Sequence, residues 1–246
     1  MGLVYRKKQR VNSYECTYDY RLSPVSMMNY FQQTSQEQSE ILDVGWKTIS
    51  DLGLAWFLVK YDLKIMEYPK FNEDIIIETE PVSFKGFASH RRFTVFDANG
   101  KVMAEALTEW MMMDLETGHI CRVDEVEANK AYQADGESTF PFRRLKRVNE
   151  WEKEKGFHVR YLDIDFNTHV NHVKYLAWAL EILPLDIVKK NRVSEVKIIY
   201  KNQGFYGDNV KVSLAEIGDL DYRVDVHNQE DVLLCQLELK LEKKED

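Results

Sequence analysis

Cysteine is scarce in this chain, and its placement disfavours two common kinds of site. The three cysteines, Cys16, Cys121 and Cys235, are odd in number, lie far apart and form no Cys-x-x-Cys pair. A disulfide framework and a cysteine-based zinc site are therefore both disfavoured. A reducing compartment fits this usage better.

Long apolar runs are also missing, and no stretch reaches the roughly 20 residues that a membrane-spanning helix needs. The basic cluster Arg6–Arg10 does not lead into the apolar core of a signal peptide. Arg6 also breaks the myristoylation-like start at Gly2. We expect a soluble cytoplasmic protein that does not insert into membranes.

Positive charge is in deficit, because 33 Lys and Arg face 41 Asp and Glu, for a net charge of −8. This balance disfavours nucleic-acid binding. The rest of the composition is that of an ordinary globular protein, with 44% hydrophobic and 30% charged residues in 246. Such a chain holds one large domain or two modest ones with a sizeable core.

The order of predicted elements occurs twice. A strand over 11–20 precedes a helix that begins at Pro24 after the N-cap Ser23 and runs to about Leu42. After the second predicted helix, which Pro184 ends, strands follow again. The predicted strands are 54–66, 74–84, 89–96 and 102–114 in the first half, and 157–162 (before the helix), 193–200, 209–217, 222–226 and 232–241 in the second. A strand, a helix and four strands, repeated, predict an internally duplicated α+β fold.

The boundaries of the two copies follow from the turn-rich, charged stretch between them. We expect a first domain over 1–115, a linker over 116–154 that contains Pro141, and a second domain over 155–246. Val25 and Tyr30 match Val170 and Tyr175 at an offset of 145 residues. That offset aligns Leu22 and Pro24 with two polar residues of the second copy, which predicts chemistry in the second half only.

Those polar residues belong to the segment Asp163–Tyr175. Asp165, Asn167 and His169 fall two apart, so an extended backbone would point their side chains the same way. The helix that follows is apolar nearly all round and should be buried. Free N–H groups and the positive end of its dipole suit a carbonyl oxygen that gains negative charge during a reaction.

Simpler interpretations of this segment compete with catalysis. Asp165 and Asn167 are also common cap and turn residues. An EF-hand calcium loop fails, because its sixth position is Thr168 instead of Gly and its twelfth is Lys174 instead of Glu. His169 and His172 have metal-ligand spacing, but the sequence offers no evident third ligand.

The segment Asp-x-Asp-x-Asn-x-His-Val-Asn-x-x-Lys-Tyr resembles the signature of acyl-acyl carrier protein (acyl-ACP) thioesterases, which are double hotdog proteins. The runs Trp56–Met66 with Tyr68–Lys70, Ser89–Phe93 and Thr108–Met113 are similar to other runs of that family. The resemblance covers about 14–241. It implies two tandem hotdog domains, each a long helix wrapped by an antiparallel sheet, that hydrolyse fatty acyl-ACP without cofactor or metal.

The resemblance also implies roles for individual residues. Asn167 and the helix-terminal N–H groups would hold the thioester carbonyl, and His169 or Asp165 would activate water. Gln203 would help to place that water. The chain departs from the plant members at this point, since Gln203 and Gly204 stand where they carry an acidic residue and a cysteine.

The resemblance implies that the first half accommodates the acyl chain. It also implies that an acidic carrier protein docks on the surface, which would need a local basic patch. The candidates for the chain-binding pocket, which are equally typical of a plain core, are Met27, Met28, Phe31, Trp56 and Phe57. The candidate basic patches for the carrier are Lys7–Arg10, Arg143–Arg147 and Lys189–Arg192. An acyl-CoA thioesterase and a non-catalytic acyl-carrier-binding protein stay open as alternatives, and a homodimer is allowed.

Overall fold

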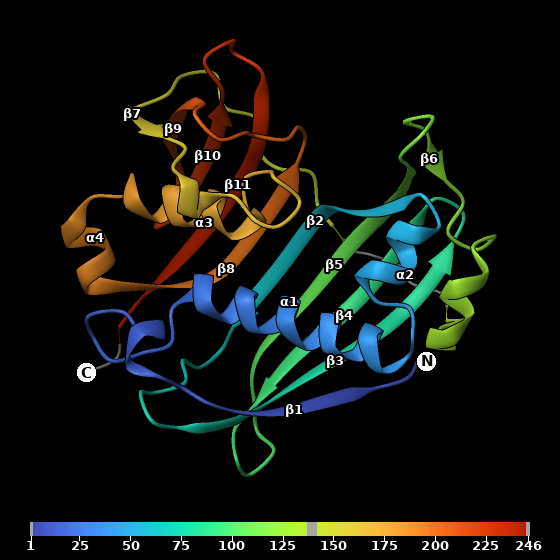
Figure 1. The fold of residues 1–246 in the computed structure, drawn as a ribbon. Helices are drawn as coiled ribbons and strands as arrows, with labels where there is room; N and C mark the ends of the chain where they lie inside the picture. The colour runs from blue at the N-terminus through green and yellow to red at the C-terminus, as the bar shows by residue number, and fades with distance from the viewer. Residues whose placement is uncertain (1, 137–141, 245–246) are drawn as a thin grey trace. The chain divides into compact units, whose positions relative to one another are not determined.

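The computed structural model describes residues 2–136 and 142–244. The chain divides into two compact units, Met1–Pro141 and Phe142–Asp246. Both units consist of an antiparallel sheet with a helix against one face (Figure 1). The predicted α+β class with two hotdog units is therefore confirmed.

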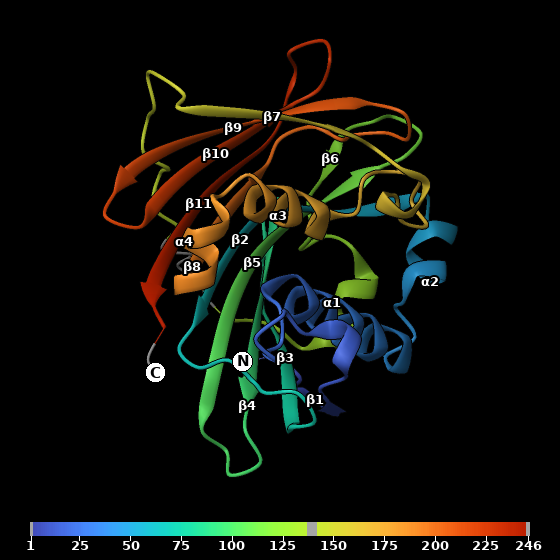
Figure 2. The same cartoon turned by 90° about the vertical axis from the view of Figure 1, so that its left-hand side faces the viewer.

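The first unit orders its strands β1-β3-β4-β5-β2, with β6 beside β5. Figure 2 shows its long helix, α1 (Pro24–Ile41), lying over one face of these strands. The helix begins as predicted: the Ser23 hydroxyl accepts the N–H of Ser26 at 3.0 Å, and Pro24 takes the first helical position. The strands and smaller elements are β1 (Tyr5–Arg10), β2 (Leu54–Ile65), β3 (Asp74–Lys85), β4 (Ala88–Phe96), β5 (Val102–Asp114), β6 (Ile120–Cys121), α2 (Trp46–Asp51) and the 3-10 helices η1 (Ser13–Glu15) and η2 (Glu127–Tyr132).

The second unit orders its strands β8-β11-β10-β9-β7. Its central helix, α3 (His172–Glu181), buries an apolar stripe, and Trp178 stacks on Phe157 with ring centroids 6.0 Å apart. The helix ends before Pro184, which instead forms the N-cap of a separate short helix, α4 (Leu185–Lys190). The other elements are β7 (Lys153–His158), η3 (Tyr161–Asp163), β8 (Asn191–Tyr200), β9 (Asn209–Gly218), β10 (Asp221–His227) and β11 (Leu233–Lys243).

The predicted first strand of each copy was wrong by several residues. The strands are β1 and β7, which end at Arg10 and His158, and each is followed by a 3-10 turn. In β1 the charged residues alternate outward on a sheet edge, where Arg6 pairs with Glu78 and charged side chains discourage further strand pairing. The basic cluster was therefore strand, and the residues after it form a turn.

The segment predicted as a linker, 116–154, contributes secondary structure to both units. Val123 and Tyr132 are buried in the first unit, and the Asn129 side chain donates to the carbonyl of Val123 at 2.8 Å. Val123 packs with Ile49 and Met112 because it lies beside the β5–β6 pairing. At the other end, β7 begins at Lys153. Pro141 lies outside the described residues.

No helix among the described residues is both long enough and apolar enough to cross a membrane.

Candidate active site

The candidate residues lie on a tight loop that precedes α3. The N–H of Asp165 donates to the carbonyl of His169 at 2.9 Å, and the N–H of Thr168 donates to the carbonyl of Asp165 at 3.0 Å. Thr168 has a φ of 66°, which closes the turn in the left-handed region. The predicted extended backbone is therefore wrong. The loop still brings Asp165 and His169 opposite each other, with Asn167 exposed at the tip.

A buried carboxylate holds the base of this loop. The side chain of Asp163 is 1% exposed and contacts Arg160 Nε and Lys174 Nζ, each at 3.1 Å. Its carbonyl accepts the N–H of Asn171 at 2.9 Å, so one residue fixes both ends of the loop. Burial alone would raise the pKa of Asp163, but the bonds from Arg160 and Lys174 outweigh it and lower the pKa to about 2. We did not predict this anchor from the sequence, although the spacing Arg160-x-x-Asp163 is that of a capping box.

The two titratable groups of the loop shift in opposite directions because both are partly buried. Burial raises the pKa of Asp165, while the N–H of Asn167 at 2.8 Å from its Oδ1 and the nearby His169 oppose that rise. Burial lowers the pKa of His169, against the pull of Asp165. The His169 ring packs edge-on against Phe205 with centroids 5.2 Å apart. A neutral imidazole beside a carboxylate can accept a proton from water.

The start of α3 offers fewer free N–H groups than the sequence predicts. Asn171 is the N-cap, and its side chain accepts the N–H of Val173 at 3.2 Å while its carbonyl accepts that of Lys174 at 2.9 Å. These two N–H groups are therefore already bonded, and the expectation that helix-terminal N–H groups hold a carbonyl stays a prediction. The Asn167 side chain is an amide donor that stays exposed.

Gly204 lies beneath the loop, next to the exposed Gln203. Its carbonyl accepts the N–H of Val170 at 2.9 Å, and its own N–H points to the hydroxyl of Tyr175. A Cβ at position 204 would lie 3.0 Å from Val170 Cγ2 and 3.2 Å from the Tyr175 hydroxyl. Position 204 is thus closed to any side chain unless these neighbours move.

His172 begins α3 but does not complete a metal site. Burial lowers its pKa to about 4, and its ring contacts Tyr200 edge-on with centroids 6.2 Å apart. Over residues 2–136 and 142–244 the structure has no group of three or more His, Cys, Asp or Glu placed to hold a metal ion.

The first unit contains the same loop 148 residues earlier in the sequence, so that Glu15 corresponds to Asp163. The N–H of Thr17 donates to the carbonyl of Arg21 at 2.8 Å, that of Tyr20 to Thr17 at 3.0 Å and that of Ser23 to Glu15 at 2.9 Å. Each bond repeats one in the second loop, and Tyr20 repeats the positive φ of Thr168.

The offset of 145 residues that we predicted between the two copies was therefore wrong. It rested on two chance identities, whereas the equivalent backbone hydrogen bonds give an offset of 148. The counterparts of Asp165, Asn167 and His169 in the first unit are Thr17, Asp19 and Arg21. Leu22 and Pro24, which the offset of 145 had paired with Asn167 and His169, are not their counterparts.

The candidate chain-binding residues fall into two groups. Met27, Met28 and Phe31 are closed into the core of the first unit, and Phe31 stacks on Phe93 with centroids 5.0 Å apart. Trp56 and Phe57, on β2, are partly exposed. Trp56 also packs with Phe84 near the Met112 cluster.

Two hotdog units in one chain, with a carboxylate, an amide and an imidazole on the loop of the second, define a tandem hotdog protein with one candidate active site. Models of the acyl-ACP thioesterase N-terminal and C-terminal domains match residues 2–130 and 146–246. The chain belongs to the acyl-ACP thioesterase family.

Curated relatives are similar at low identity. The chloroplastic palmitoyl-acyl carrier protein thioesterase of Arabidopsis thaliana is 26% identical over 248 residues, which cover 93% of this chain and 60% of that protein. Oleoyl-acyl carrier protein thioesterase 1 of the same plant is 26% identical, over 88% of this chain and 66% of its own length. The chain spans between about half and two thirds of the length of these curated relatives.

Solved structures share the fold over nearly the whole chain. The 12:0-ACP thioesterase from Umbellularia californica superposes with a TM-score of 0.89 at 20% identity and covers 99% of each chain. An acyl-ACP thioesterase from Bacteroides thetaiotaomicron gives a TM-score of 0.86 at 18% identity, over 97% of this chain and 98% of that one. These likenesses establish the fold.

Proposed function

We propose that this chain hydrolyses the thioester of fatty acyl-ACP to free fatty acid and carrier thiol. The observation that carries the proposal is the second loop, where Asp165, Asn167 and His169 occupy one tight turn in a member of the acyl-ACP thioesterase family. No cofactor or metal is required for this reaction.

In this proposal His169 is the general base. Its lowered pKa keeps the imidazole neutral near pH 7, and within the described residues no hydrogen bond occupies its ring nitrogens. Asp165 is held by the N–H of Asn167 and stabilises the imidazolium that forms. His169 takes a proton from water as the water oxygen adds to the carbonyl carbon; the carbon–sulfur bond then breaks, and the imidazolium returns the proton to the leaving sulfur to give the carrier thiol.

The Asn167 side chain is the proposed donor to the carbonyl oxygen as it gains negative charge. Its exposed place at the loop tip leaves the amide available to a substrate. Gln203, exposed on the neighbouring turn, is the proposed second polar group that positions water.

We assign the acyl chain to the first unit. Trp56 and Phe57 keep partial exposure there and are the favoured contacts, whereas Met27, Met28 and Phe31 support them from the core. Each buried methylene would contribute about 0.8 kcal/mol. Ala55→Trp, next to Trp56, should therefore shift preference toward shorter chains.

Purified protein assayed against acyl-ACP and acyl-CoA series of increasing chain length, with release of free thiol measured, tests the proposal. Faster turnover of acyl-ACP at equal chain length supports it. Equal or faster turnover of acyl-CoA contradicts the assigned carrier, and absence of turnover on both contradicts the assigned activity.

A further inference from the structure

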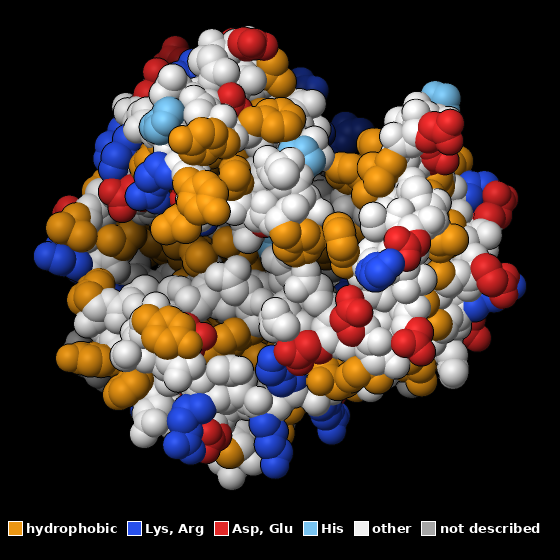
Figure 3. Space-filling model, in the orientation of Figure 1, with side chains coloured by type: hydrophobic (Ala, Val, Ile, Leu, Met, Phe, Trp, Pro, Cys, Tyr) orange, Lys and Arg blue, Asp and Glu red, His pale blue; other side chains and the backbone are white. Residues whose placement is uncertain are grey.

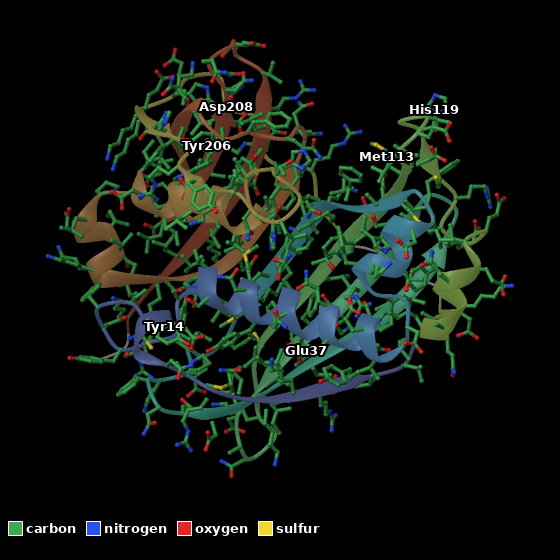
Figure 4. All side chains as sticks on the ribbon, in the orientation of Figure 1. Tyr14, Glu37, Met113, His119, Tyr206 and Asp208 are labelled. Atoms are coloured by element: carbon green, nitrogen blue, oxygen red, sulfur yellow. The ribbon has the colours of Figure 1, made fainter. Side chains whose placement is uncertain are left out.

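Large apolar side chains are exposed beside the candidate loop. Leu162 is 78% exposed, Tyr161 74%, Tyr206 64% and Phe205 49%. We call these four residues the apolar rim. Figure 3 shows hydrophobic side chains at the surface beside α3, where Figure 4 labels Tyr206. A soluble surface normally scatters such residues singly, and a cluster of them marks an interaction site.

Backbone bonds hold the two segments of the rim together next to His169. The N–H of Gly207 donates to the carbonyl of Val159 at 3.1 Å, and the N–H of Val159 donates to that of Asp208 at 2.8 Å. Phe205 forms a β-bridge with His169 as well as the ring contact. The rim therefore borders the proposed base directly.

Two exposed cations, Arg160 and Lys201, lie at the rim, next to the carboxylates of Asp163, Asp165 and Asp208. Arg160 and Lys174 share one carboxylate, Asp163, and Lys201 is exposed on the adjoining turn. Asp208 is occupied by its own turn, because it accepts the N–H of Phe205 at 2.8 Å and the side-chain amide of Gln229 at 3.1 Å. An acidic partner would meet cations here despite the net charge of −8.

We propose that the apolar rim, with Arg160 and Lys201, is the surface on which the acyl carrier protein docks. The inference rests on the proposed function and adds where the carrier binds. Tyr, Phe and Arg are the side chains that protein interfaces favour, and Tyr and Arg supply many of their strongest contacts. The thioester has to reach Asn167 and His169, so its carrier has to dock beside them.

The predicted basic patches at Lys7–Arg10 and Arg143–Arg147 suit this role less well. In the first, Lys7 is paired with Glu37 and Arg10 with Asp74. In the second, Lys146 donates to the carbonyl of Ile217, near the end of β9. Strand β9 starts just after the candidate site, so eight residues at about 3.3 Å each place this patch roughly 25 Å away.

The first unit offers matched control positions for a test. Tyr14, 83% exposed, is the counterpart of Leu162 at the 148-residue offset. Phe71 is the counterpart of Tyr206, because the N–H of Asn72 donates to Val11 as that of Gly207 does to Val159. The rim variant therefore carries Leu162→Ser and Tyr206→Ser. The first-unit variant, its control, carries Tyr14→Ser and Phe71→Ser.

The experiment measures binding of a non-hydrolysable, amide-linked acyl-ACP by calorimetry, and hydrolysis of a small acyl thioester. We expect the rim variant to bind the carrier at least tenfold more weakly and to hydrolyse the small thioester within twofold of the original rate. The first-unit variant should bind as the unaltered protein does. Lys201→Glu should weaken binding at low salt more than at high salt.

Unchanged carrier binding by a folded rim variant overturns the inference, as does equal weakening by the first-unit variant. If the rim variant lost carrier binding and small-thioester hydrolysis to the same extent, the rim would be needed for the structure of the loop, and the inference would also be overturned. Binding of anionic-lipid vesicles that depends on the rim, with carrier binding intact, would assign the surface to a membrane instead. Because the amide-linked carrier needs no turnover, a hydrolysis failure is distinguishable from a docking failure.

Discussion

The loops at 15–23 and 163–171 have the same backbone and different side-chain bonding. In the first loop the Thr17 hydroxyl donates to Asp19, and Arg21 donates to the carbonyl of Tyr68 at 3.3 Å. In the second, within the described residues, the ring of His169 and the amide of Asn167 have no such hydrogen bond. The two loops therefore share one backbone conformation. Their side chains determine whether the polar groups are bonded within the protein or stay available to a substrate.

The carboxylates that anchor the two loops differ in the charge of their partners. Glu15 accepts the N–H and the side-chain amide of Asn12, at 2.8 and 2.9 Å, and receives the Tyr30 hydroxyl. Asp163 contacts two cations. The second loop is thus tied by ion pairs where the first is tied by bonds from neutral groups, which makes the second more dependent on its carboxylate.

The largest expected effect comes from His169→Ala. Loss of a general base should lower kcat/KM for acyl-ACP by about a hundredfold or more, whereas Arg21→Ala, at the matched position, should change it less than threefold. In the unaltered protein the rate should fall as pH drops through the pKa of His169, which burial lowers below its usual 6.5, because protonated imidazole cannot accept a proton.

A pH profile of kcat/KM together with circular dichroism of both variants checks this. A folded His169→Ala protein with full activity would remove His169 from the mechanism.

The sequence predicts the helices and long strands of this fold, but it does not predict the two loops. Helix α1, with Ser23 and Pro24 at its start, and the long strands were predictable because local periodicity and capping determine them. The loops were not, since alternation at Asp165, Asn167 and His169 looks identical in a strand and in a turn. The decisive bonds join backbone atoms, whose partners no side-chain pattern reveals.

The second prediction places a side chain where the loop excludes one. Gly204→Ala should destabilise the protein by about 1–3 kcal/mol, because its Cβ would crowd Val170 and Tyr175. For a chain of this size that is a fall in Tm of roughly 2–4 °C per kcal/mol. Gln203→Glu, on the exposed neighbour, should leave Tm unchanged.

Thermal denaturation of the two variants, with activity assayed alongside, decides the point. A Gly204→Cys protein with higher activity and unaltered Tm would show that the plant arrangement fits here after all.

The third prediction compares the two anchors. The lowered pKa of Asp163 implies about 2 kcal/mol of stability, fully present above pH 3.8 and lost as pH falls through about 2. Asp163→Asn should cost about that much at pH 7, and the difference from the unaltered protein should shrink between pH 4 and pH 2. Glu15→Gln should cost less, because its partners are neutral.

Urea unfolding at pH 7 and pH 3 measures both differences. Equal costs at pH 7 for the two variants would contradict the distinction between ion pairs and neutral bonds.

The smallest effect is expected from the cysteines. Cys235 is buried in β11, where burial raises its pKa well above the usual range, and Cys16 and Cys121 lie outside the second loop. The combined variant Cys16→Ser, Cys121→Ser and Cys235→Ala should keep at least half of the activity if it folds. Inactivity of the folded variant would reveal a nucleophile that the present mechanism does not include.

The most direct test of the account replaces each loop's side chains in turn. One variant carries Thr17→Ala, Asp19→Ala and Arg21→Ala, and the other carries alanine at the three positions 148 residues later. Thiol release from acyl-ACP is measured for both under identical conditions, after circular dichroism confirms folding. We expect near-normal turnover for the first variant and background turnover for the second; equal loss in the two would contradict the assignment of catalysis to the second loop.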